Sequence, residues 1–516
     1  MKLPQGPALR IGFWAVLFLG IFAWAPATYP GYWQALEGFA PVFNVAQPGR
    51  LATIAMVPDL WRGSGAATFL VARPWLLVGA DAVTATRIAF IFCFLLGGLG
   101  IYVWLRDRLG DRAAGLAGLI YMLAPPFLAT VYVRGSLSDA LIVGLLPIAL
   151  AGVAIYAQSG SVSAAGITLI ALGWMWQTQA GLSVFCSVLL LLYALLVERS
   201  PLATLVVCLS TAAAVATIFP LLAMQVPTSV QFDDHFVALF QLFRTQWAVA
   251  PSLPGWQDQY PFQLGLVALI FSMIAFWLWC IQRPIQVPPI TNRLLCFGWV
   301  GLVFCGFAAT AGSALLWQGS GASRLLTYPW QLLLLTGPFL AVTAGSLPII
   351  HRQLQQTPYW AALVLLTVFA SYPNVTPDFT LYTPPSKPAA VVGNNEIVIL
   401  SATLTENRQQ QAATLAVTWQ PIEVIDVDYN IFFQALQGEA QELTVAAQLD
   451  AQPLGEEKPA TAWRPGEILT NTYQLDLTSI APTVPLQYHF GYYDWQTGLR
   501  LPVDGGIDDK MVFYGK

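Results

Sequence analysis

Hydrophobic residues in the first 373 positions form long runs, and short polar stretches separate these runs. A run of about 18 or more apolar residues is long enough to cross a bilayer as a helix. The pattern therefore predicts a polytopic α-helical domain with about eleven transmembrane helices. We place them at 9–27, 86–105, 113–131, 139–157, 162–178, 181–197, 201–223, 263–281, 294–316, 328–348 and 357–373.

After residue 395 the pattern changes to short alternating runs such as ATLAVTWQP, LTVAAQLD and LQYHFGYYDW, separated by Gly, Pro, Asn and Asp. Alternation over short segments between turn residues predicts antiparallel strands. We therefore expect a transmembrane domain at 1–373, a proline-containing linker at 374–394 and an Ig-like β-sandwich at 395–516.

Composition supports a membrane protein, because only 10% of the residues are charged and the mean hydropathy is +0.62. Charge is also unevenly divided: from residue 390 onward there are 16 acids and 6 bases, whereas the preceding part has more bases than acids. The chain has no basic stripe, which excludes a strongly basic nucleic-acid binder. All six cysteines lie in apolar runs and none has a metal-ligand spacing, so we expect them to act as small hydrophobic side chains in helices, without a disulfide framework.

Lys and Arg gather in connections that would all lie on one side of the membrane, including RDRLGDR, VERSP and HRQLQQ. Cytoplasmic loops carry such an excess. We therefore predict a cytoplasmic N-terminus and an extracytoplasmic C-terminal domain. The first hydrophobic segment, which ends in APA, also fits a cleaved signal peptide, and the tail lies outside in either case.

Two long outer connections are expected, at 28–85 and 224–262. The stretch 67–79 in the first is too short to span and should lie along the interface. In the second, HFVALFQLFRTQW has apolar residues at helical spacing, which predicts an amphipathic interfacial helix.

The segment YVRGSLSDAL places Arg134 and Asp139 at the entrance to an expected span. Burying a charge at the bilayer centre costs about 2.5–3.5 kcal/mol, whereas a carboxylate at a helix N-terminus complements the helix dipole. Ser136 or Ser138 could cap that helix, and Gly135 permits a tight turn. The motif is thus consistent with a helix start alone. We expect it to rim a polar cavity as well.

Other polar groups are expected at comparable depth on the outer side: Glu37, Asp59, Arg62, Asp233, Asp234, His235, Asp258 and Arg324. Asp233 and Asp234, beside His235, could hold a divalent metal ion, or they could simply complement a helix N-terminus. Arg324 could bind an anionic head group or act as an interfacial anchor.

Several of these segments are similar to a family of large bacterial membrane proteins. YMLAPPFLATVYVRGSLSDALIVGLLPIAL, VPDLWRGSGAATFLVARPWLLV, SRLLTYPWQLL and the tail segment GYYDWQTGLRLPV resemble, in order, segments of that family. The family is labelled 6-pyruvoyl-tetrahydropterin-synthase-related, and it resembles the type-C (GT-C fold) glycosyltransferases. Pterin chemistry itself needs a zinc-binding cluster of histidines, and the chain has only three histidines, far apart in sequence.

The resemblance implies a GT-C-like fold in the bacterial inner membrane that transfers a sugar from a polyprenyl-phosphate donor at the outer face. It implies a carboxylate that acts as base or binds metal, with Glu37, Asp59 and Asp139 as candidates. It also implies groups that bind the lipid phosphate and substrate, with Arg134, Asp234, His235 and Arg324 as candidates. No cofactor is required, although a divalent ion at Asp233 and Asp234 would be compatible with the chemistry.

The sequence departs from the family at two positions. Relatives carry an acid soon after the first span, where this chain has Pro30 and Gly31, and their PWRF arginine is replaced by Gln331. The alternative is therefore a non-catalytic scaffold, assembly or glycan-binding protein on a degenerate transferase fold. Its partners would be envelope glycan or protein, bound through the C-terminal domain. Tyr492, Tyr493 and Trp495 could stack on sugars there, or fill the sandwich core.

Overall fold

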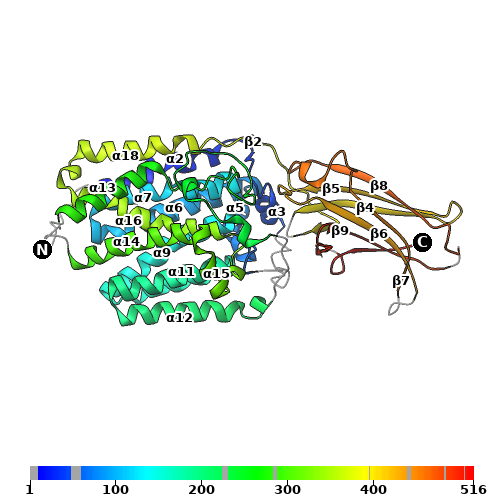
Figure 1. Cartoon of the computed structure of the whole chain (residues 1–516), viewed down its shortest axis with the longest axis horizontal. Helices are drawn as coiled ribbons and strands as arrows, with labels where there is room; N and C mark the ends of the chain where they lie inside the picture. Colours follow the sequence, from blue (N-terminus) through cyan, green and yellow to red (C-terminus); the bar gives the residue numbers. More distant parts are fainter. Residues whose placement is uncertain are drawn as a thin grey trace. The chain divides into compact units, whose positions relative to one another are not determined.

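The computed structural model describes residues 10–47, 60–223, 230–282, 288–393, 396–438, 443–481, 484–504 and 506–515. The chain forms two compact units, each considered by itself below (Figure 1). The first consists of Met1–Gln34 and Val57–Thr380, and the second of Ala35–Met56 and Leu381–Lys516.

The α-helices are α1 Ile11–Leu19, α2 Ile21–Trp24, α3 Ala40–Ala46, α5 Arg73–Leu77, α6 Ala82–Leu109, α7 Asp111–Met122, α8 Pro125–Ala129, α9 Leu137–Ser159, α10 Val162–Thr178, α11 Ala180–Leu192, α12 Pro201–Ile218, α13 Leu266–Gln282, α14 Pro289–Ala308, α15 Ala314–Ser320, α16 Thr336–Gly345, α17 Leu347–Ile350 and α18 Thr357–Ser371.

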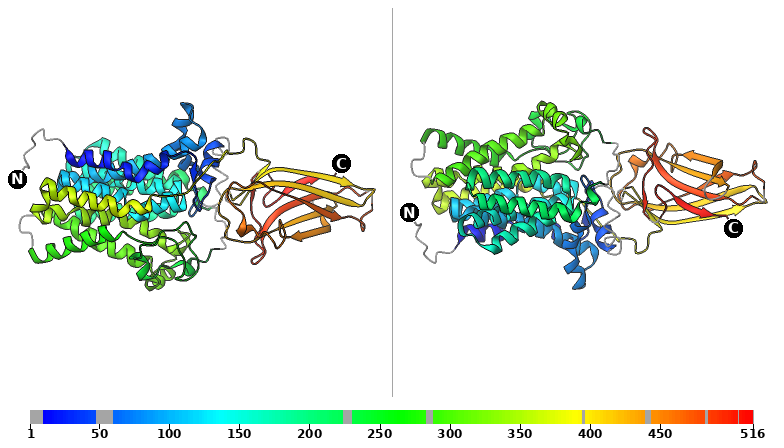
Figure 2. Two further views of the ribbon diagram at one scale, coloured as in Figure 1. Left: turned by 90° about the horizontal axis from the view of Figure 1, so that it is seen from above. Right: turned by 90° about the horizontal axis from the view of Figure 1, so that it is seen from below.

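The first unit is a bundle of long apolar helices that lie side by side (Figures 1 and 2). Within the described ranges, eight helical segments are long and apolar enough to cross a membrane, so this is a multi-pass membrane protein. These segments are Ile11–Thr28, Ala82–Leu109, Asp111–Arg134, Leu137–Ser159, Ala180–Glu198, Pro201–Ile218, Pro289–Ala308 and Pro329–Ile350.

Three further expected spans form helices that are shorter than 18 residues. They are α10 and α13, each of 17 residues, and α18, of 15 residues. The predicted number of eleven spans is therefore not established.

Small residues allow the helices at the centre of the bundle to pack closely. A side chain at Gly144 of α9 would meet the backbone oxygen of Cys93 of α6 at 2.8 Å, and one at Gly98 of α6 would collide with Met122 at the end of α7. Helix association in lipid relies on such close packing, because apolar burial supplies little driving force there. The residues of α7 from Ala113 onward are buried, as are all of α16.

The helix that follows α7 is broken before it reaches Asp139. Pro125 and Pro126 begin α8, which continues into the π-helix η4, Thr130–Arg134. Gly135 then adopts φ +74°, and α9 begins after Ser136. A proline lacks the N–H that would continue the preceding helix, so the helix breaks at this pair.

In the described parts of the outer connections, the helices are short. In the first, the 3₁₀ helix η3 (Ala66–Ala72) and α5 are too short to span, as expected. In the second, η7 (Phe232–His235) and η8 (Leu239–Leu242) replace the predicted amphipathic α-helix, which is wrong. Tertiary hydrogen bonds explain the difference, because Val237 N–H donates to the oxygen of Ala309 at 2.9 Å.

The second unit contains the predicted antiparallel β-sandwich, which is confirmed (Figure 1). A five-stranded sheet of order β10-β3-β4-β5-β8 accompanies a four-stranded sheet of order β11-β9-β6-β7. The strands are β3 Ala390–Val392, β4 Ile397–Asn407, β5 Ala412–Pro421, β6 Tyr429–Gln437, β7 Thr444–Ala451, β8 Leu469–Asp476, β9 Gln487–Asp494, β10 Val503–Asp504 and β11 Met511–Tyr514. Alternate residues such as Leu415, Val417 and Trp419 of β5 fill the core.

Residues 35–47 also belong to the second unit, although the sequence places them in the first outer loop. Phe39 N–H donates to the oxygen of Ile422 at 2.6 Å, and its ring stacks on Tyr382 with 3.9 Å between centroids. Val424 N–H donates to the oxygen of Leu36 at 2.9 Å. Hydrogen bonds that join residues almost 400 positions apart leave no local sequence signal.

Candidate functional site

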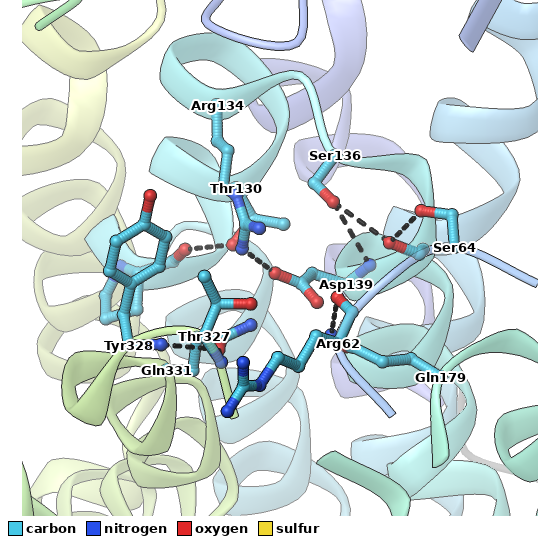
Figure 3. A network of polar contacts seen from close by, with 12 residues as sticks. Arg62, Ser64, Thr130, Arg134, Ser136, Asp139, Gln179, Thr327, Tyr328 and Gln331 are labelled. Atoms are coloured by element: carbon cyan, nitrogen blue, oxygen red, sulfur yellow. Dashed lines mark hydrogen bonds and ion pairs between the residues drawn. The ribbon is translucent and has the colours of Figure 1, made fainter. Parts of the chain in front are cut away.

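The ion pair between Arg134 and Asp139 lies at the centre of a polar network inside the helical unit (Figure 3). Arg134 ends η4, Asp139 lies in the first turn of α9, and the left-handed turn at Gly135 brings the two side chains together. The Asp139 side chain is 1% exposed and that of Arg134 is 16% exposed. Burying this carboxylate is tolerable because a guanidinium accompanies it.

One carboxylate oxygen of Asp139 retains hydrogen-bonding capacity. Arg134 binds Oδ2, whereas Oδ1 has no hydrogen-bond partner among the residues that the structure describes. Gln331 is fully buried beside this carboxylate, and its Nε2 also lacks a partner within the same described ranges. The Gln331 amide acts as a hydrogen-bond donor toward the Asp139 carboxylate, so the two atoms face each other as donor and acceptor without normal hydrogen-bond geometry.

Serine side chains connect the first outer loop to the start of α9. Ser64 Oγ donates to Ser138 Oγ at 2.9 Å, and Ser138 lies 3.1 Å from Ser136 Oγ. Ser136 is also the N-cap of α9 and accepts from the backbone N–H of Asp139, which confirms the predicted cap.

Backbone hydrogen bonds fix the loop segment 60–65 in the break between α10 and α11. Ala180 N–H donates to the oxygen of Leu60 at 2.9 Å, and Gly65 N–H donates to the oxygen of Thr178 at 2.6 Å. Gln179 Nε2 donates to the oxygen of Arg62 at 2.9 Å. This anchoring directs the Arg62 side chain toward Gln331 and the Arg134–Asp139 pair (Figure 3).

Gln331 stands where the PWRF pattern has an arginine, and its side chain acts as a hydrogen-bond acceptor. Its Oε1 accepts from the backbone N–H groups of Thr327 at 3.0 Å and Tyr328 at 3.2 Å, and so caps the 3₁₀ helix η11, Pro329–Leu335. An arginine has no acceptor and could not make these bonds.

A small, partly open apolar hollow borders this network, and its enclosed space is about 10 Å³, room for about one water molecule. Its lining is Pro126, Ala129, Tyr260, Pro261, Phe262, Trp330, Leu333 and Leu334. The Arg134 guanidinium lies over the Trp330 ring, 5.5 Å from its centroid, so the cation borders the hollow. The indole Nε1 of Trp330 is buried and has no acceptor among the described residues.

A second polar network lies in the outer connection 230–262. His235 Nδ1 lies 3.1 Å from Ser252 Oγ, Ser252 Oγ donates to Asp258 Oδ2 at 3.3 Å, and Gln241 Nε2 donates to Asp258 Oδ1 at 2.6 Å. Asp258 is 4% exposed. Burial raises the pKa of this carboxyl, and the hydrogen bonds from Gln241 and Ser252 oppose that rise.

Aromatic rings join the two networks. The His235 ring packs edge-on against Tyr328 at 4.9 Å, and Tyr328 stacks on Trp330 at 5.0 Å. Tyr260 packs on the same indole at 4.7 Å. One aromatic wall therefore separates His235 from Arg134.

The hydrogen bonds of these two networks do not include the other predicted site residues that the structure describes. Asp233 and Asp234 are exposed, and Gln318 Nε2 donates to Asp233 Oδ2 at 3.3 Å. Arg324 is exposed at the end of η10, Ala322–Arg324. Among the described residues, no three His, Cys, Asp or Glu side chains are grouped as metal ligands, so the metal prediction gains no support. Asp59 lies outside the described residues, and Glu37 belongs to the second unit.

The absence of the expected early acid has a steric explanation. Gly31 has φ +87°, and a side chain there would meet the backbone oxygen of Thr380 at 2.8 Å. The close approach arises because β1 (Tyr32–Trp33) pairs with β2 (Phe379–Thr380). This backbone cannot carry an acid at that position without rearrangement.

Sequence reasoning missed Ser64, Gln179, Gln241 and Ser252 as members of these networks. The available signal was weak: each is a neutral polar residue in or beside an apolar stretch. Only the folded chain shows that they join these networks.

No protein-family model matches the chain, and no curated protein matches it. Among solved structures, it is similar to arabinofuranosyltransferase AftD from Mycobacteria, with 14% identity and a TM-score of 0.43, over 72% of this chain and 27% of that chain. ArnT from Cupriavidus metallidurans in the apo state gives 15% identity and a TM-score of 0.33, over 66% of this chain and 78% of that chain. This chain thus spans less than a third of the arabinofuranosyltransferase. Both TM-scores lie below 0.5, so only the residues of the site bear on function.

Proposed function

We propose that this protein is a GT-C-like membrane glycosyltransferase that transfers a sugar from a polyprenyl-phosphate donor at the outer face of the bacterial inner membrane. The observation that carries the proposal is the buried Arg134–Asp139 pair, which faces the Gln331 amide and borders an apolar hollow. A lipid-linked sugar has the same two parts: an apolar chain and an anionic, hydrogen-bonding head.

The reaction assigns a role to each charge. Asp139 accepts the proton of the acceptor hydroxyl as its oxygen attacks the anomeric carbon. The bond from that carbon to the phosphate oxygen breaks, and the electron pair leaves with the lipid phosphate. Arg134 and Arg62 stabilise the added negative charge on the phosphate, because guanidinium groups bind phosphate oxygens through paired hydrogen bonds.

The walls of this small hollow would contact the first part of the lipid chain. Aliphatic and aromatic side chains line the hollow, and Trp330 Nε1 is a buried donor at its wall without an acceptor among the described residues. His235, Asp234 and Arg324 would contact the donor head or acceptor from the outer connections. Glu37 and Asp59 remain alternative bases, and a divalent ion at Asp233 and Asp234 remains an option. The sandwich would bind envelope glycan or protein.

The test compares Asp139→Asn with Asp107→Asn in membranes supplied with a polyprenyl-phosphate-linked sugar. Asp107 is an exposed partner of Arg106 in the last turn of α6 and serves as the matched control. We expect Asp139→Asn to lower transfer at least tenfold and Asp107→Asn to leave it unchanged. If both folded variants retain wild-type transfer, Asp139 is not the base. If the wild-type chain transfers no sugar from the donors tried, the non-catalytic alternative is favoured.

A further inference from the structure

The donor and acceptor roles in the hydrogen-bond network around Asp258 can be assigned one after another, starting from the backbone N–H of Ala238. Ala238 N–H can only donate, and it donates to Gln241 Oε1 at 2.7 Å. The carbonyl end of this amide is therefore fixed, and its Nε2 must donate to Asp258 Oδ1. Both the amide orientation and the acceptor role of Asp258 are thus determined.

The same reasoning extends to the histidine. Asp258 Oδ2 accepts the single proton of Ser252 Oγ. The oxygen of Ser252 then has only lone pairs to offer His235 Nδ1, which lies 3.1 Å away. With Asp258 ionised, and so able only to accept, this contact is a hydrogen bond when Nδ1 carries the proton.

We propose that Asp258, acting through Ser252, holds the neutral His235 ring in the tautomer protonated on Nδ1. Asp258, Ser252 and Gln241 are positioning residues in this arrangement. The ring they orient packs against Tyr328, which stacks on Trp330 beneath Arg134. A role of this ring in sugar transfer depends on the proposed function, whereas the tautomer does not.

Burial makes the arrangement specific. Gln241 and Asp258 are each 4% exposed and His235 is 9% exposed, so water competes poorly for these hydrogen bonds. Among the residues that the structure describes, the charged groups near the relay include Asp233 and Asp234, which precede His235 in η7, and Arg244, which acts electrostatically on Asp258. Asp233 and Asp234 are exposed, so solvent screens their charges more strongly.

The tautomer can be measured directly because the chain has only three histidines. The full chain, labelled with ¹⁵N in the imidazole rings and held in lipid nanodiscs, is examined by NMR above the pH at which the rings become neutral. His351→Gln and His489→Gln assign the signals. We expect the His235 ring to be protonated on Nδ1 and unprotonated on Nε2.

Variants then test the cause. In Asp258→Asn the new amide can donate to Ser252, whose proton can then turn toward His235 Nδ1. We expect the tautomer population to shift toward protonated Nε2. Ser252→Ala removes the hydroxyl and should also lower the fraction of His235 protonated on Nδ1. Ser252→Thr keeps the hydroxyl and should retain the wild-type fraction. Asp509→Asn in the second unit is the control and should leave that fraction unchanged. A His235 ring protonated on Nε2 in the wild type, or an unchanged ratio in folded Asp258→Asn, would overturn the proposal.

Sugar transfer supplies a separate readout. If His235 exchanges a proton during transfer, Asp258→Asn should move one limb of the pH–rate profile, and Ser252→Thr should retain the wild-type profile. A shifted tautomer with an unshifted profile would remove His235 from the reaction while leaving the relay in place. A wild-type chain without transfer would contradict the proposed function, and the NMR result would still decide the relay.

Discussion

Arg134 and Asp139 form a buried ion pair across the left-handed turn at Gly135, although only five positions separate them in the chain. The pair occupies the junction between a π-helix and a membrane-spanning helix. Charges in such a setting are costly alone and tolerable together. Three predictions concern this pair and the segments around it, and a fourth concerns the β-sandwich.

Removing only the cation should destabilise the helical unit. Arg134→Met leaves the Asp139 charge buried without its partner, and we expect a loss of about 3 to 5 kcal/mol in the free energy of unfolding. The double variant Arg134→Met/Asp139→Leu should lose less, because no uncompensated charge remains. Unfolding of the detergent-solubilised chain by denaturant measures both values. Equal losses for the single and double variants would show that the ion pair does not account for the effect.

Gln331 should matter chiefly as an acceptor. Gln331→Ala leaves the N–H groups of Thr327 and Tyr328 without their acceptor, which costs about 1 to 3 kcal/mol for each buried group. Gln331→Glu keeps the acceptor and adds a second carboxylate beside Asp139. We expect Gln331→Glu to be the less stable of the two near neutral pH and to regain stability as the pH is lowered. Thermal unfolding of both variants at several pH values tests this order.

Gly181 should not tolerate even a methyl group. A Cβ there would collide with the backbone oxygens of Leu325 and Trp61, neither of which can rotate away. We expect Gly181→Ala to lower stability by about 1 to 3 kcal/mol and to weaken the attachment of the loop segment 60–65. Gly173→Ala is the control, since nothing lies within 4 Å of its Cβ. Limited proteolysis near Arg62 should separate the two variants.

The β-sandwich should lose stability as the pH falls below about 6.5. Burial lowers the pKa of His489 from its ordinary value of 6.5, and the positive charges of Lys510 and Arg500 lower it further. Below 6.5 the unfolded chain therefore binds a proton that the folded chain resists, and unfolding is favoured. Above 6.5 this residue contributes no slope. The loss should stop once the pH falls below the folded-state pKa.

The neighbouring amide agrees with a neutral ring, because Gln487 Nε2 lies 3.0 Å from His489 Nε2 and can donate to it. His489→Gln should flatten the pH dependence, whereas His351→Gln should not. Protease sensitivity of the second unit during heating, measured between pH 5 and 8 in the full chain, is a suitable assay. An unchanged slope in His489→Gln would assign the pH dependence to other groups.

The sequence by itself determined the architecture of the two parts. Long apolar runs must form helices in lipid, because each satisfies its own backbone hydrogen bonds. Alternation in the tail must form strands, with residues such as Tyr492 turned into the core, where it is fully buried. The motif at 134–139 was also readable, because its turn glycine, capping serine and charges are close in sequence and act locally.

Tertiary structure alone decided which distant groups meet. The burial of Gln331 beside Asp139, the contact of Ser64 with Ser138 and the chain from Gln241 to His235 all join separate segments. Tertiary structure also determines where two expected acids cannot act. The pairing of β1 with β2 leaves no room for a side chain at Gly31, and Glu37 folds with the second unit. Local sequence patterns encode the period of a helix or strand. Hydrogen bonds between remote segments depend on how those helices and strands pack, and their geometry is fixed only when the whole chain has folded.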